Sequence, residues 1–253
     1  MTEFRLAISF LTRIPVGHID ATPAAHGAST RYYPVVGALL AVLTLFLLFL
    51  GSWAFDRYVG CILAVATLAA CTGALHLDGL ADCVDGLAVN GNAAKRLSVM
   101  KDPRAGGVSV AVIALWLLLK VALVARCVDA GTVAQGVWCA LVFARAPIPF
   151  ELREGEPATP GSGLFAFLHT EVTKNDWLIA LLFGLAFLTP ALAPLGGIFV
   201  RAAIGVIAGV VATGAWHVLW YRRIGGLNGD VLGAAVEIRE LAMLAAMGVQ
   251  LPF

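Results

Sequence analysis

The sequence has few charged residues and few cysteines, and each shortage excludes a class of protein. Asp, Glu, Lys and Arg make up only 13% of the 253 residues, whereas soluble domains carry about 25%. This argues against a water-soluble enzyme. The 17 basic and 16 acidic side chains leave a net charge of +1, too small to hold a nucleic-acid backbone, so we expect no nucleic-acid partner. The five cysteines form no CxxC pair, and we interpret them as packing residues.

The sequence is instead rich in long apolar runs. Hydrophobic residues account for 60% of the chain, and the mean hydropathy is +0.89. Runs of about 18 to 24 residues recur, each long enough to cross a ~30 Å hydrocarbon layer as a helix. We therefore predict an all-α, polytopic membrane bundle with about seven transmembrane helices, forming one membrane-embedded domain over residues 1–253. The expected helices are 34–55, 59–77, 108–125, 132–149, 177–200, 202–221 and 231–249.

Two segments are less regular than the others. Residues 1–33 are expected to lie at the membrane interface. The last predicted helix carries Glu237, Arg239 and Glu240 within an apolar stretch. It could lie along the interface, or it could pack in the bundle with its polar stripe facing inward.

The distribution of Lys and Arg predicts the orientation of the bundle. Twelve fall on one side, against three on the other, which are Arg57, Arg126 and Arg201. This bias predicts a cytoplasmic amino terminus and cytoplasmic loops at 78–107, 145–176 and 222–230.

The strongest chemical signal is an acidic motif after the second apolar run. Asp78, Asp82 and Asp85 are spaced i, i+4, i+7, so on a helix they share an arc of about 60°. Three carboxylates on one face require a cation, and oxygen ligands favour Mg²⁺. Carboxylate-bound Mg²⁺ is typical of phosphoryl or nucleotidyl transfer. The alternative is a solvated acidic helix end.

Basic and glycine-rich segments follow the acidic motif. Lys101, Asp102 and Arg104 precede Gly106 and Gly107 before the third helix, an arrangement that favours phosphate binding, although basic loop charges also set topology. Later, Gly225, Gly226 and Gly229 lead into Asp230, with Glu237 two turns further on the same helix face. Asp230 is either a site residue or a helix N-cap.

Three further cations stand alone near or within apolar runs. Arg13 precedes Pro15, Arg145 precedes Pro147, and Lys120 lies within the third predicted helix. A lone charge in a bilayer is costly unless it is paired. Arg13 and Arg145 are therefore either cytoplasmic anchors or phosphate ligands, and Lys120 is expected to be a buried partner of an acid.

Five ordered motifs resemble those of the cobalamin synthase family, the adenosylcobinamide-GDP ribazoletransferases. The motifs begin at Phe10 (FLTRIPV), Tyr33 (YPVVG), His76 (HLDGLADCVDG), Met100 (MKDPR) and Gly225 (GGLNGDVLGAAVE). The resemblance covers residues 10 to about 240. The sequence departs from the family pattern at Pro103, where Ser is expected, and at Asn228, where Thr is expected.

The resemblance implies a reaction and a set of site residues. Adenosylcobinamide-GDP and α-ribazole, or its 5′-phosphate, would give adenosylcobalamin, or its 5′-phosphate, and GMP, with Mg²⁺ required. We expect this chemistry at the cytoplasmic face of a bacterial inner membrane. The candidates are Asp78, Asp82 and Asp230 for catalysis, the same three with Asp85 for the metal, and Arg13, Lys101, Arg104, Arg145 and Asn228 for phosphate. His76, Asp102, Lys120 and Glu237 are further polar candidates.

The sequence is also compatible with two other functions, and with assembly into a homo-oligomer. Asp82 to Gly86 (DCVDG) is similar to the first half of the CDP-alcohol phosphotransferase motif, but the Ala-Arg that follows there is absent. A cation transporter would account for Lys120 and Glu237. However, the aspartates lie at one membrane face, whereas transport sites usually lie near the midplane.

Overall fold

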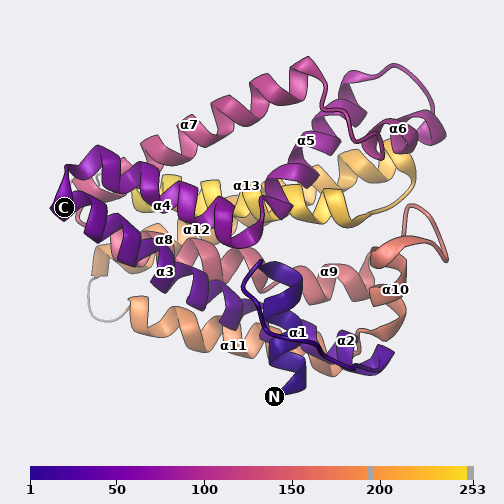
Figure 1. Cartoon of the computed structure of the whole chain (residues 1–253), viewed down its shortest axis with the longest axis horizontal. Helices are drawn as coiled ribbons and strands as arrows, with labels where there is room; N and C mark the ends of the chain where they lie inside the picture. The colour runs from indigo at the N-terminus through magenta and orange to yellow at the C-terminus, as the bar shows by residue number, and fades with distance from the viewer. Residues whose placement is uncertain (193–195, 250–253) are drawn as a thin grey trace.

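The protein is a bundle of helices that run largely along one axis (Figure 1). The computed structural model describes residues 1–192 and 196–249, and its helices within these ranges confirm the predicted all-α class. They are α1 (Thr2–Leu11), α2 (Pro23–Ser29), the 3₁₀ turn η1 (Thr30–Tyr32), α3 (Tyr33–Ala54), α4 (Arg57–Thr72), α5 (Leu75–Ala88), α6 (Ala93–Met100), α7 (Gly107–Asp129), α8 (Val133–Arg145), α9 (Ile148–Glu154), α10 (Gly163–Glu171), α11 (Lys174–Leu192), α12 (Gly196–Ile224) and α13 (Gly229–Met247).

Several helices are long and apolar enough to cross a membrane. Among the described residues, four stretches meet this requirement: 23–54, 107–129, 133–154 and 197–224. The number rises to six if α4 with α5, and α10 with α11, each form one bent span. Leu115 and Leu118 on α7, and Ile207 and Val211 on α12, are exposed apolar residues suited to lipid contact. The protein is therefore a polytopic membrane protein. A seventh membrane-spanning helix stays a prediction.

The second predicted helix, 59–77, is wrong at its carboxyl end. It stops at Thr72 because Gly73 and Ala74 adopt left-handed backbone conformations, with φ of 59° and 56°. The chain then turns by 86° into α5, a separate helix that carries all three aspartates of the acidic motif. The three aspartates therefore share one helical face, as predicted. The helix that carries them is α5, which lies nearly at right angles to α4.

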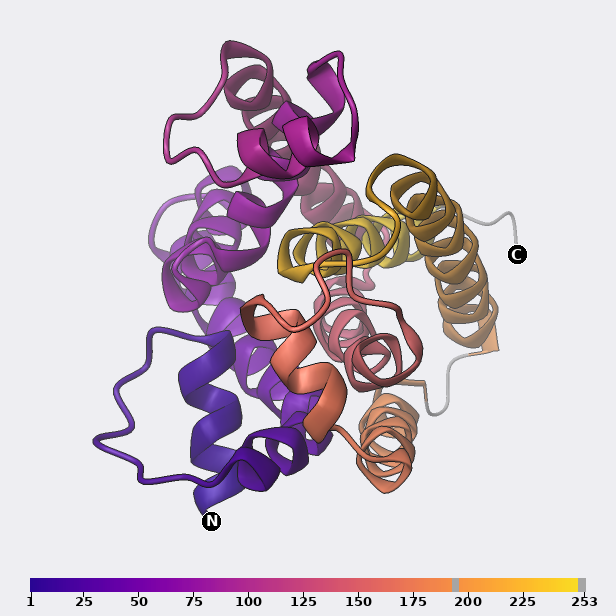
Figure 2. The same cartoon turned by 90° about the vertical axis from the view of Figure 1, so that its right-hand side faces the viewer.

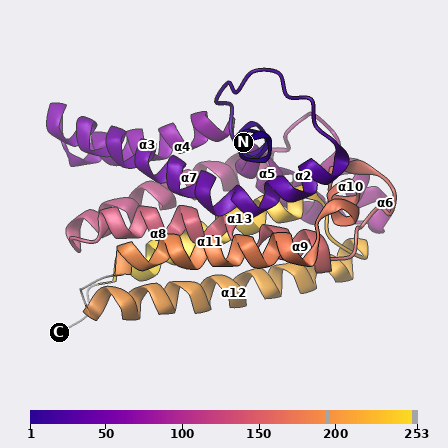
Figure 3. The same cartoon turned by 90° about the horizontal axis from the view of Figure 1, so that it is seen from below.

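The predicted boundary between helices 177–200 and 202–221 is also wrong. Arg201 lies inside α12, which begins at Gly196, and α11 ends at Leu192. Residues 193–195 belong to the predicted helix 177–200 and lie outside the described residues. α12 runs along one edge of the bundle beside α11 (Figure 3).

The last helix is the central helix of the bundle. Fourteen of the 19 residues of α13 are buried, including Glu237, Arg239 and Glu240. Viewed from the end that carries α6 and α10, α13 lies in the middle of the surrounding helices (Figure 2). Of the two predicted placements, the inward-facing one is therefore correct.

Candidate active site

The acidic helix α5 and the start of α13 meet at one end of the bundle. Their backbones come so close that a Cβ atom added to Gly79 would lie 2.9 Å from the backbone oxygen of Asp230. One turn further along α13, Gly233 approaches the Cα atom of His76 in the same way, at 3.4 Å from its ideal Cβ position. Glycine at these positions lets the two helices cross closely. Their carboxylates then gather at the end of the bundle that faces the viewer in Figure 2.

Asp230 joins this cluster, and its N-cap alternative is wrong. The N-cap of α13 is Asn228, whose Oδ1 atom accepts a hydrogen bond from the Val231 backbone N–H at 2.9 Å. The Asn228 side-chain amide also donates to the Asp230 carboxylate, at 2.9 Å. Burial, together with the charge of Asp78, raises the pKa of Asp230 to about 6.

The carboxylates of α5 have different surroundings. Asp78 is exposed, and Asp82 is half-buried within electrostatic reach of Asp230, Asp78 and Asp85. The Asp85 carboxylate accepts hydrogen bonds from the Gly106 backbone N–H and the Ser109 hydroxyl, both at 2.8 Å. Asp85 therefore anchors the start of α7, through contacts with residues 21 and 24 positions further along the chain.

Of the four predicted phosphate-binding cations, Lys101 is the one that shares a cavity with this cluster. It lines the same cavity as Asp78 and Asp230, and its side chain is exposed. Arg104 instead forms a two-pronged ion pair with Asp102, with nitrogen-oxygen distances of 2.9 and 2.7 Å. Hydrogen bonds from Arg104 lower the pKa of Asp102 to about 2. Arg13 packs against Gly73 at the bend between α4 and α5.

The carboxylates suit a metal that the substrate helps to bind. In the described part of the chain, no three His, Cys, Asp or Glu side chains converge as a ready-made metal site. Mg²⁺ is usually held by one or two carboxylates, with water and substrate phosphate oxygens completing its octahedron. Asp78, Asp82 and Asp230 supply oxygen ligands of this kind, and Asp85 keeps only part of its carboxylate free.

A cavity of about 360 Å³ opens beside the aspartates. Its walls come from α1, α5, α6, α9, α10 and the first two turns of α13. Sequence reasoning missed the contribution of α10, because its lining residues, such as Phe165 and Leu168, are apolar and form no chemical motif. A cavity with a carboxylate and ammonium mouth can take a phosphorylated ligand with an apolar portion.

One wall of the cavity is a loop, residues 155–162, that is tied to the glycine-rich segment before α13. The Leu227 backbone N–H donates to the Glu156 carbonyl, and the Ala158 N–H donates to the Leu227 carbonyl, both at 2.8 Å. The contact requires glycine at position 226, where a Cβ atom would lie 2.4 Å from the Glu156 oxygen. Gly226 therefore lets the segment before α13 pack directly against this loop.

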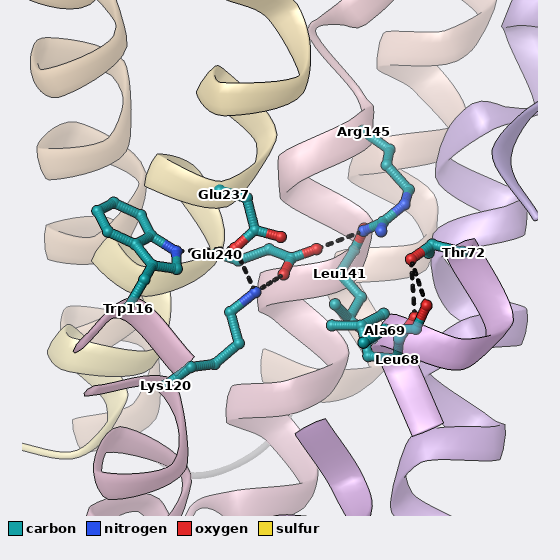
Figure 4. A network of polar contacts seen from close by, with 9 residues as sticks. All are labelled: Leu68, Ala69, Thr72, Trp116, Lys120, Leu141, Arg145, Glu237 and Glu240. Atoms are coloured by element: carbon teal, nitrogen blue, oxygen red, sulfur yellow. Dashed lines mark hydrogen bonds and ion pairs between the residues drawn. The ribbon is translucent and has the colours of Figure 1, made fainter. Parts of the chain in front are cut away.

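Behind the cavity, a buried set of ion pairs joins α13 to its neighbours. The Lys120 ammonium donates to Glu237 at 2.6 Å and to Glu240 at 2.8 Å, and the Trp116 indole donates to Glu237 (Figure 4). Lys120 is therefore the buried partner of an acid, as predicted. Sequence reasoning missed a second pair, between Arg239 of α13 and Glu151 of α9.

Arg145 falls in both the predicted helix 132–149 and the predicted cytoplasmic loop 145–176, and the structure places it in the helix. Arg145 is the last residue of α8 and is fully buried, and its guanidinium donates to Glu240 at 2.9 Å (Figure 4). Its partner lies 95 residues away in the sequence, so no local pattern indicates the pair. Arg145 does not line the cavity, and Glu237 likewise belongs to the buried ion pairs.

Fold and site together define a helical membrane protein with a carboxylate cluster at the mouth of a cavity at one end of its bundle. The family model described as cobalamin-5-phosphate synthase matches residues 3–248, and the chain belongs to this family.

Curated relatives give the same assignment. The chain is 38% identical to the adenosylcobinamide-GDP ribazoletransferase of Alkalilimnicola ehrlichii, over 96% of this chain and 93% of the relative. It is 34% identical to the enzyme of that name from Pseudomonas aeruginosa, with 96% of each chain covered. The Bradyrhizobium diazoefficiens enzyme is 33% identical, over 96% and 92%. No solved structure matches the chain.

Proposed function

We propose that this protein joins adenosylcobinamide-GDP to α-ribazole, or to its 5′-phosphate, and releases GMP. The product is adenosylcobalamin or its 5′-phosphate, so the reaction is a late step of cobalamin biosynthesis. One observation carries the proposal: relatives named for this transferase align with 96% of the chain, so the acidic, basic and glycine-rich motifs all fall within the match. We place the reaction at the cytoplasmic face of a bacterial inner membrane, on the evidence of the loop charges.

In the proposed reaction, a ribose hydroxyl of the acceptor attacks the phosphorus that carries the cobinamide arm. A new oxygen–phosphorus bond forms, the bond to the bridging oxygen of the diphosphate breaks, and GMP leaves with that oxygen. The hydroxyl proton passes to a base, for which Asp78, Asp82 and Asp230 are the candidates. Lys101 and Asn228, which line the same cavity, would bind phosphate oxygens.

We propose that Asp78, Asp82 and Asp230 hold Mg²⁺ together with the diphosphate, with a contribution from Asp85. When bound, Mg²⁺ would offset the negative charge that develops on the phosphate oxygens. The support for this proposal is the gathering of carboxylates from two helices that are far apart in sequence.

Neither alternative function accounts for the structure as well. A phospholipid-forming CDP-alcohol phosphotransferase shares the chemistry, but the family match names a cobalamin enzyme. A cation transporter would use the buried charges, yet the described acids Glu237 and Glu240 are already neutralised by Lys120 and Arg145. The buried charges therefore give no separate support for transport.

The test is an assay of the purified protein in lipid vesicles with adenosylcobinamide-GDP and α-ribazole, with and without Mg²⁺. We expect GMP and a corrinoid product in equal amounts, and only when Mg²⁺ is present. Parallel reactions use a CDP-alcohol donor. Release of CMP in place of GMP would move the assignment to the phospholipid enzymes, and release of neither nucleotide would overturn transferase activity on these donors.

A further inference from the structure

The cavity has a polar mouth and an apolar interior. Its polar lining residues are mostly exposed or half-buried: Asp78, Lys101, Thr159, Ser162, Asn228 and Asp230. Apart from His76, its most deeply buried side chains are apolar: Leu11, Ile148, Leu152, Phe165, Ala166, Leu168, Leu227, Leu232 and Val236. Polarity therefore changes with depth, and a ligand that fills this cavity must have one charged or hydroxylated end and one apolar end.

The length of the cavity follows from α13. Asp230, Gly233 and Val236 all line it and are spaced three residues apart on one side of the helix. At 1.5 Å per residue, the carboxylate at the mouth and the valine inside are separated by about 9 Å along the helix axis. An aromatic nucleoside, with its sugar at one end and its flat ring at the other, has this form.

Only one part of the two proposed substrates matches the interior. Guanine presents several hydrogen-bonding groups, which buried leucine and phenylalanine side chains would leave unpaired. A corrin ring with its amide side chains is too large for 360 Å³. The methylated benzimidazole of α-ribazole is flat and apolar, and its single free ring nitrogen can meet His76, the one buried polar side chain among the described lining residues.

We propose that the interior of this cavity binds the base of the acceptor nucleoside, while the ribose faces Asp78 and Asp230. The assignment rests on the proposed function, because it places one of its two substrates. It puts the acceptor hydroxyl at the mouth, beside the carboxylates, and leaves the cobinamide donor to approach from outside the bundle. The 155–162 loop covers the nucleoside, because Pro157, Thr159 and Ser162 line the same cavity.

The test uses one variant that fills the interior of the cavity and one that makes it more polar. The KM of each substrate is then measured separately. Ala166→Leu adds bulk on the buried wall of α10, and Val236→Thr keeps the shape of the side chain while adding a hydroxyl. We expect each to raise the KM for α-ribazole by about tenfold or more and to leave the KM for adenosylcobinamide-GDP unchanged. Thr170→Leu, at an exposed position of α10 outside the cavity, is the matched control and should change neither value.

A second measurement does not depend on the folding of variants. Free 5,6-dimethylbenzimidazole, added to the wild-type protein, should inhibit competitively against α-ribazole and not against the donor. A rise in the donor KM in the variants, or competition of the free base with the donor, would overturn the assignment and give the cavity to the nucleotide. Unchanged kinetics in both variants, with no inhibition, would leave the cavity to another occupant such as a lipid chain. Failure of wild-type transfer would instead count against the proposed function itself.

Discussion

At the scale of single residues, the aspartates differ in what else they do for the structure. Asp230 caps nothing, since Asn228 performs that role. Asp85, in contrast, accepts two hydrogen bonds that hold the start of α7. A substitution at Asp230 changes a single hydrogen bond, the one from the Asn228 amide, and removes no helix cap, whereas one at Asp85 changes both hydrogen bonds at the start of α7.

Asp230→Asn should abolish transfer while leaving the fold intact, because the two side chains have nearly the same shape. We expect a fall in kcat of roughly 10³-fold, equivalent to about 4 kcal/mol of transition-state stabilisation. Steady-state kinetics at saturating Mg²⁺, with size-exclusion chromatography as the check on folding, measure the effect. Asp56→Asn is the matched control, since Asp56 caps α4 at the other end of the bundle and Asn also caps well. Wild-type rates in Asp230→Asn would remove Asp230 from the site.

Asp82→Asn should cause a loss of similar size, since Asp82 lies within reach of the three other aspartates. Asp85→Asn should also lower activity, but it should lower the thermal stability of the protein as well, because Asp85 loses one charge-assisted acceptor at the start of α7. Comparing the melting temperatures of the two variants separates these effects. Equal stability of both variants would mean that the Asp85 anchor contributes little to the fold.

At the scale of elements, the buried ion pairs hold α13 in place among its neighbours. Lys120→Met would leave Glu237 without its cation and should destabilise the protein by about 3–5 kcal/mol. Thermal unfolding in detergent measures this loss, and the double variant Lys120→Met/Glu237→Gln should recover part of it. Arg126→Met, which removes a more exposed cation from the same helix, should cost less than about 1 kcal/mol. Equal effects of Lys120→Met and Arg126→Met would show that burial of the charge does not matter.

The loop contact at Gly226 gives a second prediction at this scale. A methyl group at this position would collide with the Glu156 carbonyl, so Gly226→Ala should separate the loop from the segment before α13. We expect faster proteolytic cleavage within 155–162 and a higher KM for α-ribazole. Gly214→Ala is the control, because a Cβ atom there meets no other atom within 4 Å. An unchanged cleavage rate would show that the loop is held by other contacts.

At the scale of the whole molecule, the orientation of the bundle can be tested directly. Arg222→Cys lies at the end that carries the site, whereas Phe55→Cys lies in the connection between α3 and α4, and both positions are exposed. A membrane-impermeant thiol reagent applied to intact cells should label Phe55→Cys and should label Arg222→Cys only after permeabilisation. Labelling of Arg222→Cys in intact cells would reverse the predicted topology.

How much of this molecule the sequence predicts depends on the range of the interactions. The helical face of Asp78, Asp82 and Asp85 is a local property, and it was predicted from spacing alone. The bend at Gly73 and Ala74 is harder to predict. Gly73 is its only sequence signal, because Ala rarely adopts the left-handed conformation that Ala74 has here. Long-range ion pairs have no local sequence signal at all. Arg145 resembles a loop cation, and only the fold shows that Glu240 lies beside it.

The buried ion pairs also impose an order on the biogenesis of the protein. Lys120 is synthesised 117 residues before Glu237, and Arg145 precedes Glu240 by 95. A lysine well inside an apolar helix, as Lys120 is in α7, costs about 2.5–3.5 kcal/mol during insertion. A nascent chain that has reached α8 thus carries two cations without their anions, and α13, which is synthesised later, neutralises both. A chain truncated before Glu237 would keep these charges uncompensated, which makes it a ready substrate for membrane proteases.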